Sequence, residues 1–342
     1  MNLERKTQGE RLAAIVERFS QRKIVVGGDL VADQFLFGEI SRVSREAPVL
    51  ILRHERTETT PGGAANCAAN LAALGAQVRL VGVVGQDAAG QALLESLGAA
   101  GVECRSVFAL PAHHTTTKVR ILAGQIHSTR QQVIRVDYES APLSDEGVRE
   151  QLRLRMLEEV KAADAVIISD YNYGVADEAM GAAVREAVRG RNIPVLVDSR
   201  FRLSHFHGFT SATPNEDEVE QVLGKQLKNV SELETAGREL REQLGYRSLL
   251  ITRGSQGMML FEPGSKPLQI EPVGAREAVD VTGAGDTVIA TYTLALASGA
   301  TFADAAHLAN HAGGLVVMKR GTATVDRQEL LSSVHRSSEA ES

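Results

Sequence analysis

The chain has 342 residues, a formal net charge of −6, 43% hydrophobic and 23% charged residues, and two cysteines. This composition is typical of a globular protein with a sizeable core. The acidic balance argues against a general nucleic-acid binder, and two cysteines cannot build a disulfide framework. No apolar run reaches the ~18 residues of a membrane span, and the charged N-terminus lacks the apolar core of a signal peptide, so we expect a cytoplasmic protein without a membrane partner.

Short apolar runs alternate with helical patterns along most of the chain. Five runs are continuously apolar, as buried parallel strands are, namely 23–28, 78–84, 165–169, 193–197 and 248–252. Segments with helical composition lie between them, at 64–74, 88–100, 144–162, 177–189 and 231–244. The alternation predicts a three-layer α/β/α sandwich around a mostly parallel sheet. We expect a helix within residues 1–19 and a frayed polar tail over residues 331–342.

Two stretches, about 34–53 and 115–137, alternate apolar and polar residues instead. Such alternation is typical of antiparallel strands with one exposed face. These stretches stand as insertions between βα units, so we expect a small antiparallel sheet that protrudes from the main one. A protruding sheet beside a ligand crevice is suited to be a lid or a dimer surface.

The segment VDVTGAGDT, residues 279–287, precedes an apolar helix. Gly283, Ala284 and Gly285 let the backbone approach a ligand, and the first amides of the helix form an anion site. Asp286 would repel a phosphate there, unless it takes a proton from the hydroxyl that attacks the phosphate. The alternative is that Asp286 is an ordinary first-turn acid.

This segment resembles the C-terminal signature of the PfkB (ribokinase-like) carbohydrate kinases. PGGAANCAANLAALG, residues 61–75, resembles the sugar-side signature of the same family. The two occur in the family's order, and the resemblance covers about residues 20–330. It implies one ribokinase-like kinase domain over 20–330, ATP and Mg²⁺ as cofactors, Asp286 as the catalytic base, and the backbone of Gly283–Gly285 as the anion hole.

On the sugar side, Gly62 and Gly63 precede the helix at 64–74, and Asn66 lies in its first turn. Glycine amides and the Asn66 amide can bond sugar hydroxyls, although the glycine pair alone is also an ordinary strand-to-helix turn. Asp29 follows the first strand at its carboxyl end, where open α/β sheets bind ligands, and Asp33 lies four residues on. The resemblance implies that these carboxylates grip sugar hydroxyls, Asp29 ahead of Asp33, for which a solvated turn acid is the alternative.

On the nucleotide side, the resemblance implies that Asn215 and Glu218 lie near magnesium and the phosphates, with Glu218 acting through water. Read without the family, TPNEDE is simply a good helix start. The loop TRGSQG, with Thr252, Arg253, Gly254 and Gly257, corresponds to the family's cover over the nucleotide phosphates. Asn310, with small neighbours, resembles the adenine-side helix; tight helix packing is the alternative.

Within the family, the closest resemblance is to the heptose 7-phosphate kinases of lipopolysaccharide precursor synthesis. It rests on GDLVADQFLFGEISRVSREAPVLIL, TTTKVRIL and TRQQVIRVDYE. It implies phosphorylation of the anomeric C1 hydroxyl of D-glycero-D-manno-heptose 7-phosphate, which gives the 1,7-bisphosphate. It also implies a homodimer through the lid strands. Because the sequence ends soon after the kinase signature, we expect a separate nucleotidyltransferase to act downstream.

A phosphorylated sugar requires cations at its far end, and the lid stretches supply Arg42, Arg45, Lys118, Arg120 and Arg135. Cations on lid strands are otherwise ordinary edge protection.

Three departures separate this sequence from the heptose kinases. Tyr173 stands where they have Lys, Asp198–Ser199–Arg200 replaces Asp-Pro-Lys, and residues 124–128 lengthen the lid hairpin. Arg200 can compensate in part for the lost lysine. The alternatives are therefore a PfkB kinase for another sugar, sugar phosphate or nucleoside, and a sensor that binds sugar or nucleotide without catalysis.

Overall fold

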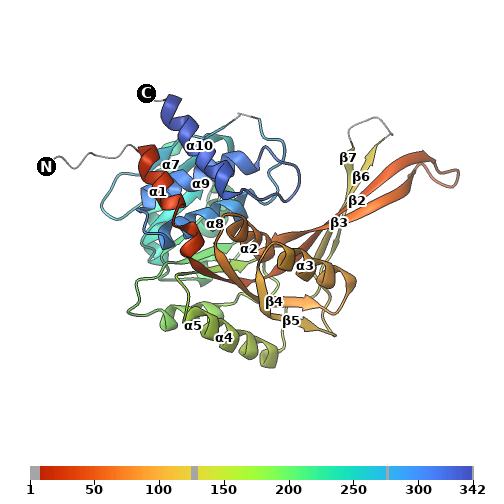
Figure 1. Ribbon diagram of the computed structural model, residues 1–342, viewed down its shortest axis with the longest axis horizontal. Coiled ribbons are helices and arrows are strands. Elements are labelled where there is room, and N and C mark those ends of the chain that lie inside the picture. The colour runs from red at the N-terminus through yellow and green to blue at the C-terminus, as the bar shows by residue number, and fades with distance from the viewer. Residues whose placement is uncertain (1–7, 125–129, 275–276, 341–342) are drawn as a thin grey trace.

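A six-stranded parallel sheet forms the centre of the molecule (Figure 1). The computed structural model describes residues 8–124, 130–274 and 277–340. The strand order is β10-β9-β8-β1-β4-β5, and each neighbouring pair is parallel. The strands are β1 (Lys23–Gly28), β4 (Gln77–Gly85), β5 (Glu103–Leu110), β8 (Ala165–Asp170), β9 (Val195–Ser199) and β10 (Ser211–Ala212). Strand β5 escapes prediction because an edge strand carries polar residues that interrupt its apolar run.

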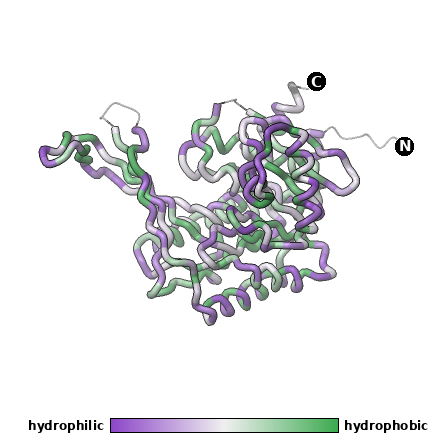
Figure 2. Tube along the Cα trace, turned by 180° about the vertical axis from the view of Figure 1, so that it is seen from behind, coloured by the Kyte–Doolittle hydropathy of each residue, from purple (hydrophilic) through white to green (hydrophobic). Residues whose placement is uncertain are grey.

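Helices cover both faces of this sheet, as the alternating pattern predicts, and each face has its own cluster of buried side chains. On one face lie α4 (Glu146–Val160), α5 (Glu178–Ala187), α6 (Glu216–Leu223) and α7 (Val230–Leu244). On the other lie α1 (Gln8–Val16), α2 (Ala64–Ala73), α3 (Ala88–Ala99), α8 (Ala284–Ala297), α9 (Phe302–Val316) and α10 (Arg327–Ala340). The fold is a three-layer α/β/α sandwich, with hydrophobic residues concentrated along its interior (Figure 2).

The predicted parallel strand at 248–252 has a different main pairing. Strand β11 (Leu249–Thr252) is antiparallel to β12 (Met258–Phe261), which pairs in turn with β13 (Leu268–Ile270). The expected parallel contact survives in part: Ser248 N donates to Thr210 O at 3.1 Å and Thr252 N to Pro214 O at 2.9 Å, beside an isolated parallel bridge to Asn215. Apolar runs alone do not distinguish a parallel from an antiparallel neighbour.

A four-stranded sheet, the lid, protrudes from the sandwich (Figure 1). Its order is β3-β2-β6-β7, with β2 (Leu30–Val43), β3 (Leu50–Gly63), β6 (Thr117–Gly124) and β7 (Gln131–Tyr138). Neighbours are antiparallel except β2 and β6, which are parallel. The first hairpin is longer than the predicted 34–53, because it continues to the glycine pair that begins α2. The predicted extra segment at 124–128 lies, apart from Gly124, outside the described residues.

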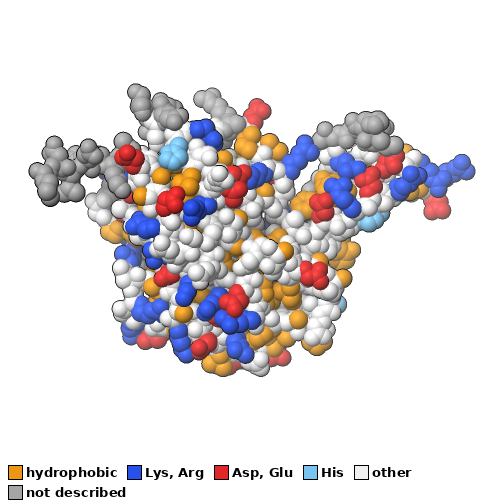
Figure 3. All heavy atoms as spheres, viewed as in Figure 1, with side chains coloured by type: hydrophobic (Ala, Val, Ile, Leu, Met, Phe, Trp, Pro, Cys, Tyr) orange, Lys and Arg blue, Asp and Glu red, His pale blue; other side chains and the backbone are white. Residues whose placement is uncertain are grey.

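The lid is unevenly exposed. Basic and acidic side chains crowd along the protruding part (Figure 3). Large apolar side chains are exposed there as well, including Val43, Leu50 and Ile134 at 58%, 48% and 53%. The mixture is consistent with either function predicted for this sheet, a ligand cover or an interface.

The expected frayed tail at 331–342 is wrong for most of its length, because α10 continues to Ala340 and packs against α1. Leu330 and Val334 are buried in this contact. The stretch looks polar because only one narrow stripe of a surface helix needs to be apolar. Among the described residues, no helix is both long and apolar enough to cross a bilayer.

Candidate active site

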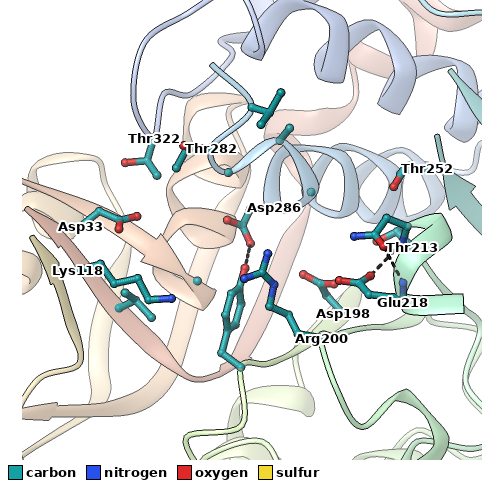
Figure 4. A pocket seen from close by; sticks show the side chains of 18 of the residues that line it. Asp33, Lys118, Asp198, Arg200, Thr213, Glu218, Thr252, Thr282, Asp286 and Thr322 are labelled. Carbon is teal, nitrogen blue, oxygen red and sulfur yellow. Dashed lines mark hydrogen bonds between the residues drawn. The ribbon is translucent and has the colours of Figure 1, made fainter. Parts of the chain in front are cut away.

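A cavity of about 400 Å³ lies where the base of the lid meets the carboxyl ends of the central strands. Figure 4 shows Asp33 and Lys118 at its lid end, Asp286 and Arg200 in the middle, and Glu218 and Thr252 at the far end. The two signature segments, far apart in the sequence, therefore contribute to one cavity. This is the place where open α/β sheets bind ligands.

The signature loop places Asp286 in the first turn of α8, with Gly283 as the N-cap residue at φ +76°. A Cβ at residue 283 would lie 2.4 Å from Asn66 Nδ2, so the position requires glycine for space as well as for conformation. The loop is fixed by Asp280, whose carboxylate accepts from Thr282 N at 3.0 Å and Gly321 N at 2.9 Å.

The helix start provides an anion site with few competing partners. Among the residues that the structure describes, no side chain caps α8, and the first amides of a helix have no partner within the helix. Ala284 N donates to Val281 O at 3.2 Å, so the Ala284 amide is already bonded. Gly285 and Asp286 line the cavity, and their amides are the remaining candidates for the predicted anion hole.

Two donors hold the Asp286 carboxylate. Asn66 Nδ2 donates to Oδ2 at 2.8 Å and the Tyr171 hydroxyl donates to Oδ1 at 2.9 Å. Burial, followed by the charge of Asp198, raises the pKa of Asp286 to about 7, and the two hydrogen bonds act against this rise. A carboxyl with a pKa near neutrality is suited to general base catalysis. The Asn66 amide thus bonds the predicted base, whereas the sequence predicted that it would bond a sugar hydroxyl.

The lid end of the cavity is cationic. Lys118, Arg120 and Arg135 line it together with Asp33, and Arg120 is ion-paired with Asp33. Burial raises the pKa of Asp33, while Arg120 and the other two cations oppose the rise. A Cβ on Gly62 would lie 2.6 Å from Asp33 Oδ2, so this glycine makes room for the carboxylate. Arg42 and Arg45, the other predicted cations, do not line the cavity.

Asp29 has a different position from the one predicted. Its carboxylate accepts from Tyr171 N at 2.8 Å and from Tyr173 N and Val175 N at 2.9 Å, and it does not line the cavity. Burial raises its pKa to about 6 against the pull of these hydrogen bonds. The geometry makes Asp29 a support for the loop that carries Tyr171. Of the two predicted carboxylates, Asp33 is the one that lines the cavity, and its contact with a sugar stays a prediction. Gly63, at φ +58°, lines the cavity beside it.

At the far end, Asn215 and Glu218 are both a helix start and part of the cavity. They form a capping box at α6: Glu218 N donates to Asn215 Oδ1 at 2.8 Å, and Asn215 N donates to Glu218 Oε2 at 3.0 Å. Asp198, which sequence reasoning did not assign, lines the same end. Burial and the Glu218 charge raise its pKa to about 7, and burial also raises the pKa of Glu218.

This far end fits a hydrated cation. Two carboxylates whose ionisation is disfavoured gain from a nearby positive charge. Within the described parts of the chain, no group of three acidic, His or Cys side chains is arranged to hold a metal directly. The carboxylates of Asp198 and Glu218 supply the oxygen donors that Mg²⁺ prefers, and Mg²⁺ bound to phosphates usually keeps several waters.

Of the other residues predicted to bind the nucleotide, one lines the cavity and four do not. Thr252 lines the cavity. Arg253 does not, since its guanidinium bonds Glu216 Oε1 at 2.7 Å and Gln256. Gly254 and Gly257 bound the adjacent turn, and Asn310 Nδ2 donates to Glu271 O at 2.7 Å, which ties α9 to the chain ahead of the signature loop. Their nucleotide roles remain predictions.

Sequence reasoning left Tyr171 and Asp198 without site roles, and gave Arg200 only a compensating one. All three lie at the carboxyl end of a central strand. Tyr171 directly follows β8, Asp198 is the next-to-last residue of β9, and Arg200 directly follows β9. Polar residues at the carboxyl ends of neighbouring parallel strands are the signal that would have found all three.

Comparisons with known proteins agree with this architecture. The profile of the pfkB family carbohydrate kinases matches residues 21–329. The bifunctional protein HldE of Nitrosococcus oceani is 42% identical over 320 residues, which are 93% of this chain and 65% of that protein. HldE of Pseudomonas aeruginosa is 41% identical with the same coverage. The chain thus spans slightly less than two thirds of the length of these relatives.

Solved structures share the fold. Phosphofructokinase-2 from Escherichia coli, in complex with potassium, superposes with a TM-score of 0.75 at 20% identity and covers 93% of this chain and 99% of its own. Ribokinase of Arabidopsis thaliana, complexed with ribose and ATP, gives 0.69 at 24% identity, with 92% and 98% covered. By its matched profile and relatives, the chain belongs to the pfkB family of carbohydrate kinases, phosphotransferases that act on a sugar hydroxyl.

Proposed function

We propose that this protein transfers the γ-phosphoryl group of ATP to the C1 hydroxyl of D-glycero-D-manno-heptose 7-phosphate. The observation that carries the proposal is the charge layout of one cavity, in which the buried carboxyl of Asp286 separates a cationic lid end from an acidic far end. An acceptor with its own phosphate fits the lid end, and Mg-ATP fits the acidic one. Similarity to HldE over 93% of the chain supports the heptose as acceptor.

The residues divide the work in a consistent way. Lys118, Arg120 and Arg135 would bind the distal phosphate, and Asp33 a sugar hydroxyl. Asp286 would take the proton of the C1 hydroxyl while the amides at the start of α8 stabilise charge on the transferring group. Asp198 and Glu218 would hold Mg²⁺ through water, and the ion would neutralise charge on the nucleotide phosphates.

A kinase for another phosphorylated sugar is the second candidate, and Tyr173 favours it. The heptose kinases have lysine there, whereas the Tyr173 hydroxyl donates to Glu139 Oε1 at 2.6 Å and adds no cation. The acceptor end therefore depends on the lid cations alone.

The test is ADP release from Mg-ATP with a panel of acceptors: heptose 7-phosphate, fructose 6-phosphate, fructose, ribose and adenosine. We expect kcat/KM for heptose 7-phosphate to exceed that of every unphosphorylated acceptor by at least ~100-fold, since a desolvated phosphate–cation contact contributes several kcal/mol. Higher kcat/KM with ribose or fructose would refute the heptose assignment, and turnover of another sugar phosphate would favour the second candidate.

A further inference from the structure

Arg200 stands in the middle of the cavity and has no role in the function described so far. It directly follows β9. Its backbone N donates to Asp170 O at 3.2 Å, and this bond holds the Arg200 backbone in place. The residue is exposed and lines the cavity. In Figure 4 its guanidinium lies between Asp286 and the Asp198–Glu218 end.

Its guanidinium is available to a ligand. Among the described residues, Arg200 makes no side-chain hydrogen bond or ion pair; its nearest recorded side-chain contact is the Tyr171 ring, with Cζ 5.6 Å from the ring centroid. The other cavity arginines are engaged, Arg120 with Asp33 and Arg135 with Asp137. Stacking on an aromatic face orients a guanidinium while leaving its N–H donors free.

The neighbouring arginine shows that this freedom is not a general property of the loop. Arg202, two residues on, pairs with the buried Asp170 carboxylate and donates to Ala176 O at 2.9 Å. The turn after β9 therefore directs Arg202 to the buried Asp170 carboxylate and leaves Arg200 in the cavity. Arg202 holds the loop, and Arg200 is presented by it.

Arg200 lies between the carboxylates at the two sides of the cavity centre. Asp198 and Glu218 lie on one side of its guanidinium and Asp286 lies on the other (Figure 4). Tyr171 in turn bonds Asp286, so a single ring contacts both the proposed base and the cation. The guanidinium therefore lies between the acidic end of the cavity, where the nucleotide is proposed to bind, and the proposed base.

We propose that Arg200 is a catalytic residue that contacts the phosphoryl group during transfer. The inference rests on the proposed kinase function. In the step, the C1 oxygen forms a bond to the γ-phosphorus, the bond from that phosphorus to the β,γ-bridging oxygen breaks, and its electron pair leaves on ADP. The proton of the C1 hydroxyl goes to Asp286 as its O–H bond breaks. Arg200 donates to the equatorial oxygens, where charge is spread at the transition state.

The competing assignment makes Arg200 part of the acceptor's phosphate site, in compensation for the missing lysine at 173. The geometry disfavours it, because the lid cations lie at one end of the cavity and Arg200 lies beyond Asp286 as seen from them (Figure 4). The two assignments differ in kinetics: transition-state contacts change kcat, and contacts made equally to bound substrate change KM.

The experiment compares Arg200→Ala and Arg200→Gln with wild type, using the best acceptor from the panel and Mg-ATP. We expect kcat to fall ~100- to 1000-fold, with both KM values within ~3-fold. Lys118→Ala is the matched control, for which we expect a higher acceptor KM and little change in kcat. Melting temperature and nucleotide binding by calorimetry establish that each variant is folded.

Added guanidinium should restore part of kcat in Arg200→Ala and leave wild type unchanged. A kcat within ~3-fold of wild type in both folded variants, or a loss confined to acceptor KM, would overturn the proposal. Absence of wild-type turnover with every acceptor would instead refute the proposed heptose kinase function, and it would be distinguished from failure of the Arg200 proposal because wild type itself is inactive.

Discussion

At the scale of single residues, the central feature of the site is the carboxyl group of Asp286, whose pKa lies close to neutral pH. Asp286 is 4% exposed, yet two neutral donors, from Asn66 and Tyr171, offset part of its desolvation. Neutral donors stabilise the ionised form without the strong stabilisation that a lysine or arginine partner would give. The pKa therefore stays near 7, high enough for Asp286 to accept a proton.

The pH dependence of turnover follows from this pKa. Asp286 must be ionised to act, so kcat/KM should fall as pH decreases through about 7, tenfold per unit at the lower end. Tyr171→Phe removes a donor that stabilises the ionised form, so the pKa should rise and the acid limb should move to higher pH by ~0.5–1 unit. The measurement is kcat/KM against pH for both proteins.

Tyr173→Phe is the control for this experiment. It also loses one hydroxyl from the same loop, but that hydroxyl bonds Glu139 at the surface. Its acid limb should coincide with that of wild type. An unmoved limb in Tyr171→Phe would show that the hydroxyl does not act on the base.

At the scale of elements, a buried ion pair joins the ends of two central strands. Asp170, at the end of β8, is 1% exposed and pairs with Arg202, while Ser199 Oγ at the end of β9 donates to it at 2.7 Å. The pair sets the loop from which Arg200 extends. A buried pair contributes little net stability, but losing one partner leaves an uncompensated charge.

Arg202→Met should therefore lower the free energy of unfolding by ~3–5 kcal/mol. Urea titration followed by circular dichroism measures the change. Arg189→Met is the control, because Arg189 makes an exposed pair with Glu186 at 2.7 Å, and such pairs contribute ~0–1 kcal/mol. Equal effects of the two substitutions would contradict the assignment of Asp170–Arg202 as a structural pair.

The lid exposes large apolar side chains, among them Val43, Leu50 and Ile134, and we propose that two copies of the chain associate through it. Ile134→Glu, on β7, should convert a dimer into a monomer, because a buried unpaired carboxylate is incompatible with an apolar interface. Light scattering after size exclusion measures the mass. Leu154→Glu on α4 is a control of matched exposure, 58% against 53%, and should leave the dimer intact. A monomeric wild type would refute the proposal.

At the scale of the molecule, the layered fold follows from the sequence because periodicity reports burial. Four of the five predicted central strands and all five predicted helices correspond to observed elements with small shifts at their ends. Burial does not report a strand's neighbour, so β11 appears as a parallel strand when its main partner is antiparallel. It also does not report an edge strand such as β5, or the narrow apolar stripe of α10.

The site was predictable where backbone geometry demands particular residues. Gly283 requires both a positive φ and the absence of a Cβ, so it marks the loop that holds Asp286. Asp29 shows the limit: its place after β1 suggests a ligand contact, but three backbone amides from a distant loop occupy its carboxylate. Tertiary partners of this kind leave no local trace in the sequence.

The net charge of −6 is unevenly distributed around the cavity. Positive side chains gather where a phosphorylated acceptor would bind, at Lys118, Arg120 and Arg135, while carboxylates gather at the far end of the same cavity. A phosphorylated ligand therefore meets a local field opposite in sign to that of the whole molecule.

The most direct test of the account is turnover by Asp286→Asn, with Mg-ATP and the preferred acceptor of wild type. The substitution keeps the shape of the side chain and removes its capacity to accept a proton. We predict a kcat at least ~1000-fold below wild type, with ATP affinity by calorimetry within ~3-fold and an unchanged or higher melting temperature. A folded Asp286→Asn protein with kcat within tenfold of wild type would contradict the central claim that Asp286 is the base of this kinase.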